Sequence, residues 1–327
     1  MNKKALEVKH NHHHVWADYL RRWSSDGKNI YYTTNKGNVV HESIKGVAKE
    51  RDFYKITELS EFDVTIIKSA SKHSPLALQQ HHMSYLADFI NLDNIYKAYK
   101  AQGRQNSKFE AHHRALKHNL LENLHSAHER KASPILKSLA NADLSILEDL
   151  HHMIEFMMYF GHQYTRTKNF KDIALSVLSR NNDFEVKCSD SMAHAWWFHS
   201  YMMGMNIGKS LFETRHIDTH ALLINNSPTP FITSDQPIIN IHPCLTTTPQ
   251  NTPPKYADFF YPISPTIAYV ICNSDTFKSG INYIENSLAK ELNEKLAKRA
   301  NAHIFGTTPK SIDDLRSLLG KAEKRPL

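Results

Sequence analysis

The 327-residue sequence has few cysteines, and none of the three, Cys188, Cys244 and Cys272, falls in a Cys-x-x-Cys spacing. An odd number of widely separated cysteines argues against a disulfide framework and against a zinc ribbon. No run of about 18 apolar residues occurs that would span a membrane. The basic N-terminus lacks the apolar segment of a secretory signal. These absences predict reduced thiols, no membrane span and a cytoplasmic location.

Several catalytic motifs are missing as well. The sequence contains no P-loop, no Gly-x-Gly-x-x-Gly, no Gly-x-Ser-x-Gly and no His-Glu-x-x-His. Nucleotide hydrolysis by a P-loop, redox chemistry on a dinucleotide, an α/β-hydrolase and a zincin site are therefore disfavoured.

Positive charge and histidine are abundant instead. The net charge is +7 without the 22 histidines, and the isoelectric point is about 9.1. This balance suits a polyanionic partner such as nucleic acid, although a merely basic soluble protein has the same composition. Hydrophobic residues make up 41% and charged residues 22% of the chain, which is ordinary for a globular protein.

The pattern of apolar residues changes along the chain. Residues 1–11 have the composition of a flexible basic arm, and a helical period dominates about 60–215, between two strand-forming parts. We predict one α+β domain over 12–310, in which the terminal strands form a mixed or antiparallel sheet packed against the helical middle. Residues 311–327 are expected to form a C-terminal helix and tail. Two independent domains are the alternative.

Seven segments occur in an order that carries a family resemblance: "HHVWADYLRRWS", "SIKGVAKERDFYKI", "ENLHSAHERKASPILKSL", "FMMYFGHQYTRTKNF", "PTPFITSDQPI", "FYPISPTIAYVI" and "ELNEKLAKRANAHIFG". Over about residues 11–308 the chain resembles the bacterial family described as domain of unknown function 4238. That family usually has Pro where this chain has Trp16. The resemblance implies a shared fold and a shared polar set, but no established activity.

These segments supply the candidate catalytic residues His13, Gln163, Arg166 and Asp235. His13 aligns with the leading histidine of the family and suits a general acid/base. Gln163 and Arg166 share a helix face, where the arginine fork would clamp a carboxylate or phosphate. Asp235 would orient His13 or a metal. The structural alternatives are a solvated or tag-like arm for the histidines, a salt bridge for Arg166 and a turn for Asp235. His10 and His12 are assigned to the arm.

Other polar residues extend this set. Arg166, Thr167, Arg21 and Gln236 are candidate substrate contacts. Glu122 and Glu129 are seven residues apart on one helix face, so that with Asp235 they would hold Mg²⁺ or Mn²⁺. A solvated helix face is the simpler explanation of the two glutamates.

The favoured function is a nuclease or other phosphodiester hydrolase, in bacterial defence or as a toxin. In this hypothesis the hairpin near Tyr31 and the strand "FITSDQPIINI" (231–241) lie in one sheet or abut, because His13 and Asp235 must meet. The alternative is a non-enzymatic sensor or binding module for nucleic acid or a phage component, in which the His-Arg-Asp set is a buried polar lock. An open cleft would favour the enzyme, and a closed hydrogen-bonded cluster would favour the module.

Overall fold

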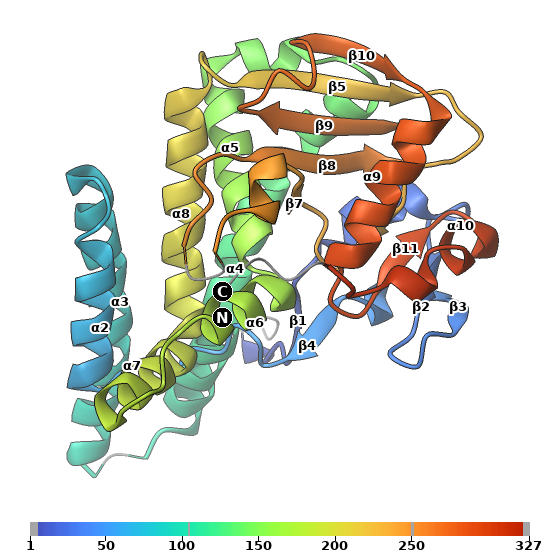
Figure 1. Ribbon diagram of the computed structural model, residues 1–327. Coiled ribbons are helices and arrows are strands. Elements are labelled where there is room, and N and C mark those ends of the chain that lie inside the picture. The colour runs from blue at the N-terminus through green and yellow to red at the C-terminus, as the bar shows by residue number, and fades with distance from the viewer. Residues whose placement is uncertain (1–5, 104, 250–251, 323–327) are drawn as a thin grey trace.

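The strands lie on either side of a helical middle in the chain, as the sequence predicts. The computed structural model describes residues 6–103, 105–249 and 252–322 (Figure 1). The fold is α+β, with its strands arranged in three sheets.

The N-terminal and C-terminal strands share a four-stranded antiparallel sheet. Its order is β3-β2-β11-β6, with bounds Val39–Ser43, Asn29–Thr33, Ile304–Gly306 and Thr233–Ser234. Tyr31 pairs with Gly306, and Thr233 pairs with Phe305. The hairpin near Tyr31 and the first part of the predicted strand 231–241 therefore lie in one sheet, with β11 between them. The part after Pro237 pairs in a different sheet, so the prediction of a single strand is wrong.

A second sheet has five strands in the order β10-β5-β9-β8-β7. Their bounds are Gly280–Ile284, Thr219–Asn225, Ile267–Cys272, Asp258–Ser264 and Ile239–Asn240. The sheet is mixed because β10 runs parallel to β5. β6 and β7 belong to different sheets, and Pro237 lies between them. A proline has no backbone N–H to donate to a strand ladder, so it suits this break between strands. The third sheet pairs β1 (Asn11–His13) with β4 (Lys49–Arg51).

The helical middle runs from α2 to α8, in agreement with the predicted span 60–215. The helices are α1 Ala17–Leu20, α2 Glu61–Ser71, α3 Leu76–Ala101, α4 Ser107–Ala140, α5 Leu150–Thr165, α6 Lys168–Ser176, α7 Asp183–His194, α8 Trp196–Thr214, α9 Asn286–Arg299 and α10 Pro309–Asp313. Short 3₁₀ segments are Arg21–Trp23, Ile44–Gly46, Ser145–Glu148, Pro243–Thr246 and Arg316–Leu318. Ser60 and Asp149 cap α2 and α5 through their side chains, which satisfies backbone N–H groups at these helix starts.

Helices α5 and α8 run side by side in very close contact (Figure 1). A Cβ atom added to Gly161 would lie 2.3 Å from the carbonyl oxygen of Gly204 and 2.6 Å from the amide nitrogen of Gly208. Only glycine permits this approach. The crossing fixes the end of α5, where Gln163 and Arg166 lie, against its neighbours.

The N-terminal segment is held against α4. The backbone N–H of Lys9 donates to Asn119 Oδ1 at 2.8 Å, and the Asn119 amide donates to the carbonyl of Glu7 at 2.8 Å. The composition predicts a flexible arm over 1–11, whereas the Asn119 side chain of a distant helix binds the backbone at Glu7 and Lys9. Residues 1–5 of that arm and 323–327 of the predicted tail lie outside the described residues.

Two predicted absences can be compared with the fold. The cysteines Cys188, Cys244 and Cys272 are all free, as expected. Among the helices of the described residues, none is both long enough and apolar enough to cross a membrane.

Candidate functional site

Arg166 follows the last residue of α5 and is almost completely buried, with 2% of its surface exposed. Its Nη2 lies 2.7 Å from Gln163 Oε1 and 2.7 Å from Glu129 Oε1. Gln163 and Arg166 thus contact each other at the end of the helix, with Arg166 just beyond its last residue. The Tyr54 hydroxyl donates to the backbone carbonyl of Arg166 at 2.8 Å. These contacts tie α5 to α4 and leave the guanidinium little access to a ligand in solution.

The charges around Arg166 interact strongly because they are buried. Burial opposes the charge of Arg166, but Glu129 raises the pKa of the guanidinium, which is therefore charged. Burial raises the pKa of Glu129 against the attraction of Arg166. Burial also raises the pKa of Glu122 to about 7, against the attraction of Arg166. Glu122 Oε2 has no hydrogen-bond partner in the described chain. The two glutamates thus differ in their contacts, since Glu129 forms a salt bridge with Arg166 and an oxygen of Glu122 is buried without a hydrogen-bond partner among the described residues.

His13 ends β1 and is partly buried. Burial lowers the pKa of its imidazole, and its Nε2 has no hydrogen-bond partner among the described residues. His14 beside it is buried, with a pKa lowered by burial to about 3. Within the described part of the chain, His13 makes no hydrogen bond to Asp235.

Asp235 has a different set of partners. Its carboxylate accepts the backbone N–H groups of Asn301 at 2.8 Å, Ala302 at 2.7 Å and His303 at 2.9 Å. Burial raises the pKa of Asp235 although these donors favour the charge. The side chain therefore holds the turn that leads into β11.

The predicted substrate contacts are spread over the molecule. Thr167 donates its hydroxyl to Gln236 Oε1, and Gln236 Nε2 donates to the carbonyl of Ile238 at 2.8 Å. Arg21 is at the surface, where it contacts Asp18 and the carbonyl of Gly27. Thr167 and Gln236 thus join the start of α6 to the segment after β6, while Arg21 belongs to a separate surface.

The predicted metal ligands do not form one group. Glu129 binds Arg166, and Asp235 binds three backbone N–H groups. In the ranges that the structure describes, the one group of His, Cys, Asp or Glu with ligand atoms close enough to share an ion is His10, Asp52 and His118.

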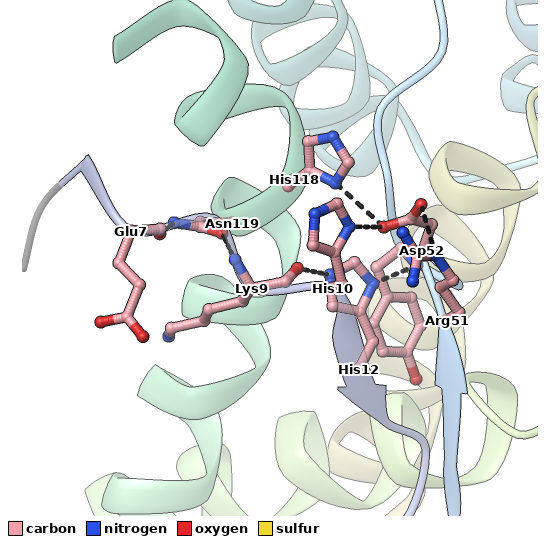
Figure 2. Close-up of polar contacts among 9 residues, drawn as sticks. Glu7, Lys9, His10, His12, Arg51, Asp52, His118 and Asn119 are labelled. Atoms are coloured by element: carbon pink, nitrogen blue, oxygen red, sulfur yellow. Dashed lines mark hydrogen bonds and ion pairs between the residues drawn. The ribbon is translucent and has the colours of Figure 1, made fainter. Parts of the chain in front are cut away.

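His10, Asp52 and His118 converge beside the start of β1 (Figure 2). His10 Nδ1 lies 2.8 Å and His118 Nδ1 lies 3.0 Å from the same oxygen, Asp52 Oδ1. The two imidazole rings meet edge to face, with centroids 4.8 Å apart. The side chains of His10 and Asp52 are 42% and 28% exposed, and that of His118 is 7% exposed. Solvent therefore reaches this group, in contrast to Arg166 and Asp235.

Local backbone contacts place these three side chains. Asp52 follows β4 with a φ of 56°, which aspartate tolerates better than most residues. Its N–H donates to the carbonyl of His10 at 2.7 Å, and the next pair along the ladder is Asn11 with Arg51. His118 comes from α4, one residue before the Asn119 that binds the N-terminal segment.

Hydrogen bonds keep this group in a state suited to binding or catalysis. Burial acts to raise the pKa of Asp52, but the hydrogen bonds and charges of His10 and His118 bring it below the ordinary value. Burial lowers the pKa of His118. The group therefore holds a carboxylate ion whose oxygen contacts two imidazole nitrogens, and carboxylate oxygen and imidazole nitrogen are both good metal ligands.

A cavity of about 340 Å³ lies against His118. It is lined by Lys55, Glu58, Asp93, Tyr96, Lys97, His113, Arg114, Lys117 and His118. Lys97 pairs with Glu58 at 2.6 Å, and Lys117 pairs with Asp93 at 2.8 Å. Lys55 and Arg114 make no ion pair within the described chain. The cavity thus offers two available cations to an anionic ligand.

Sequence reasoning missed Asp52 and His118 and assigned His10 to a tag-like arm. The one available signal was the histidine-rich stretch around His118 in "HHRALKHNLLENLHSAHER". Nothing in "KERDFYK" marks Asp52, because its neighbours come from 42 and 66 residues away. Only the fold brings these residues together.

Comparisons with known proteins add the family. The sequence profile of the family described as protein of unknown function DUF4238 matches residues 11–310. Asp52 and His118 lie inside the matched span, and His10 immediately precedes it. No curated protein and no solved structure matches the chain. With nearly its whole length matched, the chain belongs to the DUF4238 family.

Proposed function

We propose that the protein is a phosphodiester hydrolase that acts on nucleic acid, with the His10, Asp52 and His118 group as its reactive centre. One observation carries this proposal: His118 belongs both to this group and to the wall of the cation-lined cavity. A group that can activate water thus lies beside a place that can hold a phosphate.

The cavity supports recognition of an anion. Lys55 and Arg114 are exposed at its wall, and an arginine fork binds phosphate oxygens in bidentate fashion. Its volume of about 340 Å³ is at the lower end of the range for ligand pockets, which is suited to one phosphate-bearing unit of a longer chain. The net charge of +7 would attract a polyanion to the surface.

The reaction would be an in-line displacement at phosphorus. The oxygen of a water molecule forms a bond to phosphorus as the bond from phosphorus to the leaving oxygen breaks. The water gives up a proton at the centre, and the leaving oxygen receives a proton. Asp52 orients both imidazoles, while Lys55 and Arg114 stabilise the charge on the phosphate oxygens.

The test is cleavage of labelled single-stranded and double-stranded DNA and RNA, with Mg²⁺, Mn²⁺, Zn²⁺ or chelator. We expect at least one substrate to be cut. Arg114→Ala should weaken binding in a salt series and reduce the salt slope by about one unit. Lys278→Ala, an exposed cation on another part of the surface, is the matched control. Absence of cleavage in every combination would refute the proposal.

The closed networks around Arg166 and Asp235 favour a second candidate function. Arg166 is paired with Glu129, and Asp235 has three backbone donors, so this part of the predicted set fits a polar lock better than a cleft. The protein would then be a non-enzymatic sensor or binding module for nucleic acid or a phage component. Salt-resistant binding without cleavage in the same assays would select this function.

A role in bacterial defence or as a toxin in the cytoplasm is the biological setting we propose for the hydrolase. Expression of the wild-type protein should then arrest growth or restrict phage, and Asp52→Asn should abolish the effect. The same growth or phage phenotype for the wild type and Asp52→Asn, at equal protein levels, would contradict this biological role.

A further inference from the structure

We propose that His10, Asp52 and His118 bind a divalent first-row transition ion, with Zn²⁺ as the best-suited probe. The ligand atoms are two imidazole nitrogens and a carboxylate oxygen, and all lie within 4.8 Å of one another. Ion binding can be measured by itself, whereas a catalytic role for the ion rests on the proposed hydrolase function.

The distances allow an ion to enter with small movements. Zinc binds imidazole nitrogen and carboxylate oxygen at about 2.0–2.2 Å, so ligand atoms around a tetrahedral ion are about 3.3 Å apart. The two histidine nitrogens lie 2.8 Å and 3.0 Å from Asp52 Oδ1. Replacing the two N–H···O hydrogen bonds by bonds to an ion therefore requires each nitrogen–oxygen distance to open by a few tenths of an ångström, and the two nitrogens, within 4.8 Å of each other, to settle around the same ion.

The donor types decide the class of ion. Mg²⁺ prefers oxygen ligands and an octahedral shell, whereas imidazole suits Zn²⁺ and other first-row transition ions. The Mg²⁺ or Mn²⁺ site expected from the sequence rested on three carboxylates. The histidine-rich set at Asp52 therefore predicts a different class of metal at a different place.

The surroundings favour a site with an open coordination position. Three protein ligands leave a fourth position to water, as in catalytic rather than structural zinc sites. His10 and Asp52 are 42% and 28% exposed, which gives an ion and a water access from solvent. The cavity beside His118 would place a phosphate next to the bound water, whose pKa such ions lower to about 7.

Hydrogen bonds hold the backbone around the three ligand residues in place. Asp52 bonds to His10 through the backbone, and Asn119 holds the segment that leads to His10 against the helix that carries His118 (Figure 2). His12 reinforces this arrangement, because its Nδ1 accepts the N–H of Tyr54 at 2.7 Å and its Nε2 lies 2.9 Å from the carbonyl of Lys9. A pre-formed site reduces the ordering that binding would otherwise require.

The experiment uses the full chain without an affinity tag, freed of metal by chelator. Isothermal titration calorimetry with Zn²⁺ should show one site per chain, and Co²⁺ should give the visible absorption of a low-coordinate nitrogen and oxygen site. His10→Gln and His118→Gln should each weaken Zn²⁺ binding by about a hundredfold or more and abolish the Co²⁺ spectrum. His10 is partly exposed, so His10→Gln should fold and its Zn²⁺ affinity can be measured even if His118→Gln does not fold.

The matched control is the double variant His151→Gln/His152→Gln, which removes two adjacent histidines that also lie near carboxylates. It should bind Zn²⁺ as the wild type does. Absence of Zn²⁺ binding by the wild type, or equal binding by wild type and His10→Gln, would overturn the proposal. Zn²⁺ binding without nucleic-acid cleavage would uphold the metal site and refute only the hydrolase function.

Discussion

Arg166 and Glu129 form a salt bridge of 2.7 Å in which the two residues are 2% and 8% exposed. Removal of one charge would leave the other buried without a partner, which costs about 3–5 kcal/mol. Arg166→Met should therefore lower the free energy of unfolding by about that amount in urea at pH 7. The double variant Arg166→Met/Glu129→Leu should recover much of the loss, because no charge remains unpaired. A single variant as stable as the wild type would show that the pair is not a structural lock.

Asp235→Asn tests the role of the three backbone donors from Asn301 to His303. An amide oxygen accepts less strongly than a carboxylate, and the amide NH₂ cannot accept at all, so we expect a loss of about 2 kcal/mol or more in urea unfolding. Asp313→Asn is the control, since its exposed ion pair with Arg316 should change stability by less than about 0.5 kcal/mol. If Asp235→Asn were as stable as the wild type but had lost nucleic-acid cleavage, Asp235 would instead be an active-site residue.

Gly161→Ala tests the crossing of α5 and α8. The added methyl group would meet the backbone of Gly204 at 2.3 Å, so the helices must separate. Overpacking of this kind costs about 1–3 kcal/mol. Gly46→Ala is the matched control, because a Cβ there meets nothing within 4 Å. Thermal unfolding of the two variants should differ clearly, and equal melting temperatures would contradict the close packing.

Glu122 gives a pH dependence with a definite sign. Burial raises its pKa in the folded state to about 7, above the ordinary 4.5. The folded chain then keeps a proton that the unfolded chain loses, so this stabilisation is full below about pH 4.5 and is lost as the pH rises through 7. Glu122→Gln has no charge to bury, and it should gain about 1–3 kcal/mol relative to the wild type between pH 5 and pH 8.

Urea unfolding of both proteins at pH 5, 6, 7 and 8 measures this difference. Histidines with lowered pKa values, such as His14 and His128, affect both proteins alike and cancel in the comparison. A difference that does not change with pH would show that Glu122 has an ordinary pKa.

The sequence predicted those features that depend on local pattern or on neighbouring residues. The helical period locates the middle of the chain, and the spacing of Gln163 and Arg166 places both on one helix face, where they bond at 2.7 Å. The sharing of one sheet by the Tyr31 hairpin and the first part of the segment 231–241 was also predicted. The partners of the Arg166 and Asp235 side chains were not predicted. Arg166 pairs with Glu129, and Asp235 accepts the backbone N–H groups of 301–303, through tertiary contacts that sequence spacing does not reveal.

The centre at Asp52 shows the same limit more strongly. Its two histidines lie just before a strand and within a helix that are distant in sequence. The composition of the N-terminal segment predicted a solvated arm. Hydrogen bonds between the Asn119 side chain and the backbone of Glu7 and Lys9 fix that segment in place. The question of which histidine in "HNHHH" has a site role thus depends on a helix more than 100 residues away.

The most direct test of the proposed function is the single-turnover rate of nucleic-acid cleavage by the wild type and Asp52→Asn, measured at saturating protein. Asp52 orients the two imidazoles and does not line the phosphate-binding cavity. In Asp52→Asn the maximal cleavage rate should therefore fall by at least about a hundredfold, while the substrate Kd stays nearly constant. Asp313→Asn should behave as the wild type in both quantities. Cleavage by Asp52→Asn at the wild-type rate, with loss of cleavage in folded His13→Ala or Asp235→Asn, would contradict the placement of the reactive centre at Asp52.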